Sequence, residues 1–346
     1  MSETLETNTV SDTSCGHYLN FLDHDMSEWM RSGITKSAID EAVDNKRGVH
    51  YQIIDHSLYR DTDCMFPSRC EGVEYFINNV IDSLPDMDLV VNVRDYPQVH
   101  QKWPDLPVLS FSKDVTQYKD VLYPAWTFWC GGPAIDHYPR GIGRWDLMRE
   151  SITKNMVDWS NKSSIAFFRG SRTSHDRDPL IKLGRALPHL ISAEYTANQA
   201  WRSVADTLGK EPVPTVTFQD HCLYKYLVNM RGVAASFRYK HLFLCKSVVL
   251  NVDSDWIEFF YPQLKPWIHF VPIAKDMSDL EEKIEFLKAN DQIGRNIAEK
   301  GFEFIWHHLT MDSVQCYWKQ LLDRYSKLMT YKPKLNTNLI KISLNK

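Results

Sequence analysis

Short apolar runs rich in β-branched and aromatic residues alternate along the chain with longer segments in which apolar residues recur every three or four positions. The short runs predict buried strands and the longer segments predict helices, because these are the hydrophobic periods of the two structures. The expected strands are residues 89–93, 108–111, 165–168, 247–252 and 269–273. The expected helices are residues 72–84, 178–187, 278–289, 291–307 and 311–329. Alternation of this kind predicts an α/β fold in which crossover helices connect parallel strands.

A polar stretch at residues 146–164 separates two such α/β halves, and 346 residues are enough to build a core in each. We therefore expect two domains with a ligand-binding cleft between them. The predicted division is a polar tail at 1–14, a first domain at 15–150, a second domain at 151–305, a last helix at 306–330 that packs back on the first domain, and a tail at 331–346.

Composition excludes some classes of protein. Hydrophobic residues make up 43% of the chain and charged residues 24%, as in ordinary soluble globular proteins. The net charge of −4 gives no basic field that would favour nucleic acid as a partner. No stretch approaches the roughly 20 apolar residues that a membrane span requires. The kind of ligand therefore has to be inferred from motifs.

Two runs place small residues beside arginines directly after an apolar segment: residues 167–178 (FFRGSRTSHDRD) and 231–240 (RGVAASFRYK). Small residues let backbone N–H groups approach a ligand, and a guanidinium can bind two oxygens at once. The pair of runs therefore predicts a nucleoside diphosphate that is held from two sides. The alternative is that these arginines form surface salt bridges, as most arginines do, and it suits Arg169 and Arg172 better than Arg177 and Arg238.

Other nucleotide and metal motifs are incomplete. Gly141-Ile142-Gly143 begins a dinucleotide-binding pattern, but Asp146 occupies the position of its third glycine, and the sequence contains no Walker phosphate loop. Asp253-Ser254-Asp255 resembles the Asp-x-Asp that holds a divalent metal in one class of sugar transferases. It also follows an apolar run, where turns built on Asp and Ser side chains are common.

The signals for a cellular compartment disagree. Residues 1–14 are polar and lack the basic-then-apolar pattern of a signal peptide, which by itself predicts the cytoplasm. Cys64 and Cys70, in contrast, flank a short loop and predict a turn closed by a disulfide. Asn161-Lys162-Ser163 is a glycosylation sequon. Both features predict a protein of the secretory pathway.

Several longer runs occur together in one order: residues 63–70 (DCMFPSRC), 92–99 (NVRDYPQV), 123–129 (YPAWTFW), 143–147 (GRWDL), 168–174 (FRGSRTS), 231–238 (RGVAASFR) and 259–267 (FFYPQLKPW). With these runs the chain resembles the Rumi-type protein O-glucosyltransferases. The resemblance implies a GT-B fold, in which two Rossmann-like domains with parallel sheets face each other across a cleft. It implies an inverting enzyme that moves glucose from UDP-glucose to serine in the Cys-x-Ser-x-Pro/Ala-Cys context of folded EGF-like repeats, as in Notch. Some members also use UDP-xylose.

The resemblance places the catalytic base at Asp95. Asp95 follows the expected strand at 89–93, at the carboxyl end where open α/β sheets place their sites. An inverting transfer needs a carboxylate there to take the proton of the serine hydroxyl. Without the resemblance, the residues favour a turn aspartate before Tyr96 that pairs with Arg94.

The resemblance also assigns residues to the two substrates. The implied nucleotide-sugar contacts are Tyr138, Ser171, Arg177, Val233, Ala234, Ala235, Ser236, Phe237 and Arg238. The implied acceptor contacts are Met65, Phe66, Pro67, Ser68, Arg69, Ala134, Ile135, Asp136, His137, Tyr138 and Pro139. Because the arginines would stabilise the departing UDP, we expect no metal and no other cofactor.

The remaining expectations also come from the resemblance. It implies the disulfides Cys222–Cys245 and Cys15–Cys316 besides Cys64–Cys70, which leaves Cys130 as a buried thiol. It implies the lumen of the endoplasmic reticulum, with a cleaved leader and a retrieval tetrapeptide, neither of which is present in the sequence. We expect a monomer.

Two other functions stay open at this point. One keeps the fold and the UDP-sugar site but transfers the sugar to a glycan hydroxyl. The other is a non-catalytic protein that binds EGF-like domains. The presence of Asp95, Arg177 and Arg238 disfavours the second alternative.

Overall fold

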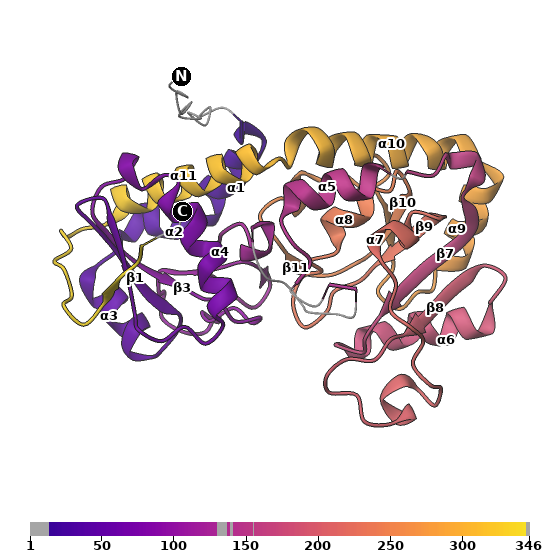
Figure 1. The fold of residues 1–346 in the computed structure, drawn as a ribbon, viewed down its shortest axis with the longest axis horizontal. Coiled ribbons are helices and arrows are strands. Elements are labelled where there is room, and N and C mark those ends of the chain that lie inside the picture. Colours follow the sequence, from indigo (N-terminus) through magenta and orange to yellow (C-terminus); the bar gives the residue numbers. More distant parts are fainter. Residues whose placement is uncertain (1–13, 130–136, 139–140, 155, 344–346) are drawn as a thin grey trace, which may run out of the picture.

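The computed structural model describes residues 14–129, 137–138, 141–154 and 156–343 of the chain. Within them the strands form two large sheets, and we call each sheet with its helices a lobe (Figure 1). A short pairing of β5 (Lys113–Asp114) with β11 (Trp256–Ile257) connects the first lobe to the second. The predicted α/β class, with parallel strands in both sheets, is confirmed.

The sheet of the second lobe is parallel throughout, in the order β12-β10-β9-β7-β8. Its strands are β7 (Ser163–Gly170), β8 (Ile191–Tyr195), β9 (Tyr224–Asn229), β10 (Val248–Val252) and β12 (Val271–Ile273). The chain passes from β7 outward to β8 and returns with β9 on the other side of β7, so the strand order reverses between β7 and β9. Open α/β sheets bind ligands at such a reversal, beyond the carboxyl ends of the strands. The two arginine-rich runs follow β7 and β9 and therefore meet at this point.

The sheet of the first lobe is mixed, where the sequence pattern predicted parallel strands. In the order β13-β2-β1-β3-β4-β6, strands β3, β4 and β6 are parallel, whereas β1 is antiparallel to β2 and β3. Its strands are β1 (Val49–Ile54), β2 (Ser57–Arg60), β3 (Met87–Val91), β4 (Val108–Ser110), β6 (Val121–Leu122) and β13 (Ile340–Lys341). The antiparallel part contains a hairpin whose turn residues, Asp55 and His56, have φ values of 47° and 53°. A two-residue turn between antiparallel strands needs positive φ, which Asp and His tolerate.

Helices pack around both sheets (Figure 1). They are α1 (Gly16–Asp25), α2 (Ser27–Ser32), α3 (Lys36–Asp44), α4 (Pro67–Asn78), α5 (Trp145–Lys154), α6 (Asp178–Ala186), α7 (Phe218–His221), α8 (Tyr239–Phe243), α9 (Leu280–Ala289), α10 (Asp291–His308) and α11 (Met311–Leu328). The five expected helices are present, and the one expected at 72–84 is α4 followed by a 3-10 turn at Ile81–Ser83. None of the helices in the described part of the chain is both long and apolar enough to cross a bilayer.

Both ends of the described chain belong to the first lobe. Helix α10 lies along the second lobe, and α11 continues from it into the first lobe, where it packs against α1 and α4 (Figure 1). The Cys15–Cys316 disulfide joins the start of α1 to α11 across a sequence separation of 301. Beyond α11 the segment expected as a tail contributes β13 to the first sheet, and Tyr331 donates a hydrogen bond to Asp88 at 2.7 Å. The predicted division into domains is otherwise still a prediction.

The disulfides among the described cysteines are Cys15–Cys316, Cys64–Cys70 and Cys222–Cys245, the pairs that the resemblance implied. Cys130 lies outside the described residues.

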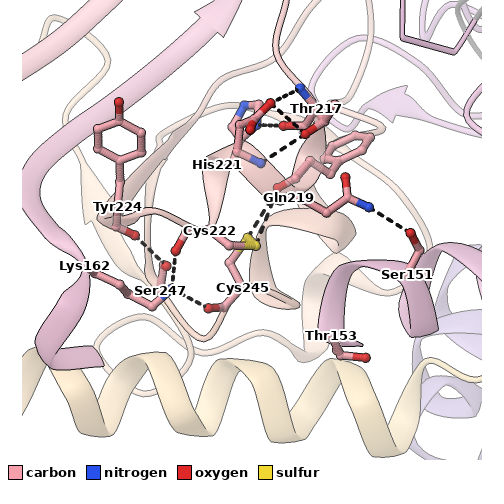
Figure 2. Close-up of a disulfide and its surroundings, with 12 residues drawn as sticks. Ser151, Thr153, Lys162, Thr217, Gln219, His221, Cys222, Tyr224, Cys245 and Ser247 are labelled. Atoms are coloured by element: carbon pink, nitrogen blue, oxygen red, sulfur yellow. Dashed lines mark hydrogen bonds between the residues drawn. A yellow bond between two sulfur atoms is a disulfide. The ribbon is translucent and has the colours of Figure 1, made fainter. Parts of the chain in front are cut away.

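Figure 2 shows Cys222–Cys245, which ties the end of α7 to the segment before β10. The buried Lys162 bridges the two cysteines, because its ammonium donates to the carbonyl oxygens of both. Burial lowers the pKa of Lys162 to about 8. Asn161, the asparagine of the sequon, is exposed beside it.

We expect Lys162→Met to lower the free energy of unfolding by about 2 kcal/mol, because both carbonyl oxygens lose a charged donor while the aliphatic stem is kept. Urea denaturation followed by tryptophan fluorescence measures the loss. Lys182→Met, on the exposed side of α6, is a matched control that should change stability by less than about 0.5 kcal/mol. Equal stability of the Lys162 variant and the original protein would contradict a stabilising role for this bridge.

Candidate active site

A cleft of about 890 Å³ is lined by residues of both lobes. The first lobe contributes Arg69, Asp95 and the turn at Trp126–Phe128. The second lobe contributes the segments that follow β7 and β9, together with part of the long connection between β8 and α7. The cleft therefore opens at the strand reversal of the second sheet, and Asp95 of the first lobe also lines it.

Arg177 and Arg238 stand side by side in the second lobe. Their guanidinium carbons lie 5.6 and 5.0 Å from the centre of the same Phe168 ring. Backbone carbonyl oxygens hold both side chains: Arg177 donates to Ser171 at 2.7 Å and to Arg231 at 2.9 Å, and Arg238 donates to Arg169. Hydrogen bonds from these two arginines thus connect the run at 167–178 with the run at 231–240.

Neither guanidinium has a carboxylate within ion-pair distance among the described residues, so the salt-bridge alternative does not apply to them. Burial and the charge of Arg238 lower the pKa of Arg177 to about 9, and burial lowers the pKa of Arg238 to about 10. One nitrogen of Arg238, Nη2, is buried without a hydrogen-bond partner in the described part of the protein. Two enclosed cations with spare donors form a site for a group that carries two negative charges.

Glycines make room for these side chains. A Cβ atom added to Gly170 would lie 3.3 Å from an Nη1 atom of Arg177 and of Arg238, and one added to Gly232 would lie 3.3 Å from Nη2 of Arg177. Both distances are tighter than ordinary van der Waals contact. The small residues of the two runs therefore serve the close approach of the arginines as well as that of a ligand.

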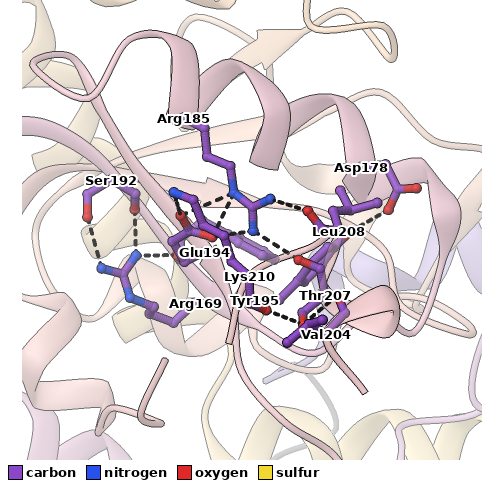
Figure 3. A network of polar contacts seen from close by, with 11 residues as sticks. Arg169, Asp178, Arg185, Ser192, Glu194, Tyr195, Val204, Thr207, Leu208 and Lys210 are labelled. Carbon is purple, nitrogen blue, oxygen red and sulfur yellow. Dashed lines mark hydrogen bonds and ion pairs between the residues drawn. The ribbon is translucent and has the colours of Figure 1, made fainter. Parts of the chain in front are cut away.

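The other arginines of the region are occupied. Arg172 pairs with Asp178 and Arg231 pairs with Asp176. Figure 3 shows that Arg169 donates to the backbone and hydroxyl oxygens of Ser192 on β8, although Arg169 also lines the cleft. The surface salt-bridge alternative therefore describes Arg172, whereas Arg169 is held by hydrogen bonds to Ser192 and to the Phe168 carbonyl oxygen.

Figure 3 also shows how the connection between β8 and α7 is fixed. Arg185 of α6 pairs with Glu194 of β8 and donates to the carbonyl oxygens of Thr207 and Leu208. Lys210 pairs with the same glutamate at 3.2 Å. These contacts anchor the middle of the connection, whose two ends, at 196–199 and 212–216, line the cleft.

Asp95 projects from the first lobe and is half exposed. Arg69 contacts its carboxylate at 3.0 Å and donates to the carbonyl oxygen of Val93 at 2.7 Å. The guanidinium of Arg69 also stacks on the rings of Phe66 and Trp126, at 4.2 and 4.5 Å. Arg69, and not Arg94, is therefore the partner of Asp95, and it orients the carboxylate at the mouth of the cleft.

The other implied acceptor residues surround this point. Met65, Phe66, Pro67 and Ser68 are exposed around the start of α4, next to the Cys64–Cys70 disulfide. Their exposure leaves this loop accessible to a macromolecule, with Arg69 as its link to the cleft.

The second implied acceptor segment touches the second lobe. Tyr138 lines the cleft, where its hydroxyl accepts a hydrogen bond from the Phe218 amide at 3.1 Å, and His137 contacts the Thr215 carbonyl oxygen at 3.0 Å. Burial raises the pKa of Tyr138. Ala134, Ile135, Asp136 and Pro139 lie outside the described residues.

Comparison with known proteins identifies the family. Residues 10–345 match the family model described as glycosyl transferase family 90. The chain belongs to glycosyl transferase family 90. Human "Protein O-glucosyltransferase 1" is 55% identical over 326 residues, which cover 93% of this chain and 82% of that protein. "O-glucosyltransferase rumi" of Drosophila melanogaster is 50% identical over 342 residues, 97% of this chain and 82% of that protein. "O-glucosyltransferase rumi homolog" of Anopheles gambiae is 52% identical over 336 residues, which cover 96% of this chain and 84% of that protein. The predicted family resemblance is confirmed.

In this glycosyl transferase family 90 protein, the cleft also contains polar residues that sequence reasoning missed. Trp126, Thr127, His221 and Glu258 are buried, line the cleft, and each carries a side-chain nitrogen or oxygen without a hydrogen-bond partner among the described residues. Buried polar atoms are normally paired, so these atoms point to a ligand that is rich in polar groups. No local motif distinguishes these residues from core residues, which is why the sequence did not reveal them.

His221 illustrates the arrangement. Its Nδ1 lies 2.8 Å from the Thr217 carbonyl oxygen and therefore carries the proton, which leaves Nε2 as an acceptor (Figure 2). Burial lowers its pKa to about 4. His221 is thus a neutral acceptor near pH 7 and fits a hydroxyl or N–H group of a ligand.

The Asp-x-Asp triplet does not belong to this site. Asp253 and Asp255 are exposed, and the Ser254 hydroxyl accepts a hydrogen bond from the Trp256 amide at 3.2 Å, as in a turn. Within residues 14–129, 137–138, 141–154 and 156–343, no three His, Cys, Asp or Glu side chains gather in a way that could hold a metal ion.

We expect Arg238→Met to weaken UDP binding by about 100-fold, because one of two charged donors to the diphosphate is lost. The melting temperature without ligand should change little, since the substitution also removes an enclosed charge. Calorimetric titration with UDP, and thermal unfolding with and without UDP, measure the two effects.

Arg172→Met is the matched control, because Arg172 comes from the same run but is paired with Asp178. It should retain the original affinity for UDP. Equal UDP affinity in the Arg238 and Arg172 variants would place the diphosphate elsewhere.

Proposed function

We propose that this protein transfers glucose from UDP-glucose to a serine hydroxyl of folded EGF-like repeats, with inversion at the anomeric carbon. One observation carries the proposal: a carboxylate of the first lobe, Asp95, and two enclosed guanidinium groups of the second lobe, those of Arg177 and Arg238, line the same cleft. A sugar whose C1 lies between them is open to a nucleophile from one side and to a leaving diphosphate on the other. The names of the relatives, which specify protein O-glucosylation, support the same activity.

The chemistry follows from this arrangement. Asp95 takes the proton of the serine hydroxyl as the serine oxygen attacks C1 and forms the new glycosidic bond. The bond between C1 and the β-phosphate oxygen breaks, and UDP leaves with the electron pair. Arg177 and Arg238 stabilise the charge that grows on the diphosphate, and we propose that they make a divalent metal unnecessary.

Features around the cleft support a folded protein as the acceptor. The Cys64–Cys70 disulfide fixes the loop that exposes Met65 and Phe66, and a fixed loop loses less conformational entropy when it binds. Arg69 connects this loop to Asp95, so an acceptor bound at the loop has its hydroxyl guided to the base.

We also propose that the lobes form a GT-B pair, supported by the two sheets on either side of the cleft. The lumen of the endoplasmic reticulum is the proposed location, since disulfides form in oxidising compartments.

The test is transfer to a folded EGF-like repeat with the Cys-x-Ser-x-Pro-Cys sequence, in the presence of UDP-glucose and EDTA. Intact mass should show the gain of one hexose on the folded repeat and no gain on the reduced repeat.

Asp95→Asn should lower kcat by about 1,000-fold, because the amide cannot take the proton, and should leave UDP-glucose binding unchanged. Asp255→Asn, an exposed aspartate outside the cleft, is the control and should be fully active. An Asp95→Asn variant with full activity would refute the assignment of the base.

A second variant tests the acceptor. Replacing Cys64 and Cys70 by Ser should raise KM for the folded repeat at least about 10-fold, because the loop becomes mobile, while UDP-glucose binding stays the same. Hydrolysis of UDP-glucose by water serves as the control, since it does not use the loop. Unchanged KM would favour a glycan acceptor instead.

A further inference from the structure

Glu258 is a carboxylate without a hydrogen-bond partner in the wall of the cleft. Its side chain is 1% exposed, and neither carboxylate oxygen meets a donor among the described residues. It follows β11, the strand that reaches across to the first lobe, and it lines the cleft. A buried carboxylate in this condition is costly, unless a ligand supplies the missing donors.

The neighbours of Glu258 do not supply them. Lys240 is fully buried and is the nearest source of positive charge, but it lies beyond ion-pair distance and donates to the Phe237 carbonyl oxygen at 3.2 Å. The hydroxyl of Tyr261, another neighbour, donates to the Ser236 carbonyl oxygen at 3.1 Å. Lys240 therefore balances the charge of Glu258 through space, while both carboxylate oxygens remain without a hydrogen-bond donor among the described residues. Burial raises the pKa of Glu258 and Lys240 opposes this shift.

Other unpartnered polar atoms lie on the same stretch of the cleft. Trp126 offers an indole N–H, and Thr127 and Ser236 offer hydroxyls; all three are buried and line the cleft. The turn at Trp126–Phe128 packs against the segment of Glu258, because the rings of Phe128 and Phe259 are 6.0 Å apart. Lys240 lies 4.7 Å from the Phe128 ring and links the two segments again.

This group of residues lies between the two parts of the proposed reaction centre. On one side, Arg69 stacks on Trp126 while it holds Asp95. On the other side, Ser236 belongs to the segment that ends in Arg238. In the proposed reaction the sugar of the donor would occupy this position, because its C1 faces Asp95 while its diphosphate reaches the arginines.

We propose that Glu258 binds the hydroxyl groups of the donor's sugar ring, with Thr127 of the neighbouring turn as a second hydroxyl-binding residue. This inference rests on the proposed function and identifies the recognition element for a neutral polyhydroxylated sugar. The two carboxylate oxygens accept hydrogen bonds from two neighbouring hydroxyls. An amide has only one acceptor oxygen and no charge, so it would bind the pair of hydroxyls more weakly. The same negative charge rejects sugars that carry a carboxylate of their own, such as the uronic acids.

The test compares UDP-glucose with UDP, because UDP lacks the group that Glu258 would bind. For Glu258→Gln we expect UDP affinity within about twofold of the original, whereas the ratio of the dissociation constant of UDP-glucose to that of UDP rises about 10- to 100-fold. The value of kcat/KM for UDP-glucose should fall by a similar factor. An unchanged ratio and an unchanged kcat/KM would overturn the proposal.

Two further variants exclude a merely structural role. Glu258→Gln combined with Lys240→Met removes the buried charges together, so recovery of the original ratio in the double variant would assign Glu258 to charge balance and refute sugar binding. Thr127→Val keeps the size of the side chain and should raise the ratio about fivefold; no change would remove Thr127 from the proposal. These two variants also test the proposal if Glu258→Gln alone does not fold.

Glu74→Gln is the matched control, because Glu74 is a largely buried glutamate outside the cleft, where it pairs with Arg60 at 3.1 Å. It should lower the melting temperature without changing the ratio. Failure of the original protein to bind UDP would instead refute the proposed function. If the original protein binds both UDP and UDP-glucose and Glu258→Gln leaves the ratio of their dissociation constants unchanged, this inference alone is refuted.

Discussion

The second lobe is organised around two positive charges that no carboxylate in the described part of the chain neutralises. Arg177 and Arg238 both lie close to the Phe168 ring, and within the described residues the hydrogen bonds of their guanidinium groups go to backbone oxygens. Removal of a cation from water costs several kcal/mol, and neutral carbonyl groups offset only part of this cost. The arrangement therefore lowers the stability of the empty protein, a cost that the diphosphate of the proposed donor would offset on binding. A Cβ atom at position 170 or 232 would crowd these guanidinium groups, which explains why glycines occur at both positions.

The sequence predicted the elements whose signals are local. Strands such as β10 are apolar runs that end in polar residues, and helices such as α10 and α11 show a clear helical period, so both were located to within a few residues. The hairpin of the first sheet was missed because Asp55-His56 is an unusual turn pair. The strands β5 and β11 have two residues each and exist because they pair with each other. Helix α5 occupies the first part of the polar stretch that the sequence suggested as a divider, and its few apolar residues include Trp145 and Ile152 on its buried face.

The candidate site divides in the same way. Asp95 and Arg238 lie in long runs that carry the family resemblance, and Arg177 lies three residues after another such run, so the sequence could assign them before the fold was known. The structure adds what a run cannot contain, namely that Arg238 is free of carboxylates while Arg172 is not. Glu258 and Thr127 were out of reach, because their significance depends on the packing of segments more than 100 residues apart. A buried polar atom without a partner is recognisable only when its surroundings are known.

In the proposed function, different parts of the cleft bind different parts of the substrates. The loop closed by Cys64–Cys70 faces outward, where an acceptor protein would bind, and the arginines face inward, where a diphosphate would bind. Trp126 and Glu258 lie between them on segments that belong to different lobes and meet through Phe128 and Phe259. A shift of one lobe against the other would move Asp95 relative to the arginines and would also separate Trp126 from Glu258. A sugar held by both would therefore fix the relative position of base and leaving group, so that recognition of the sugar and alignment for its transfer become the same event.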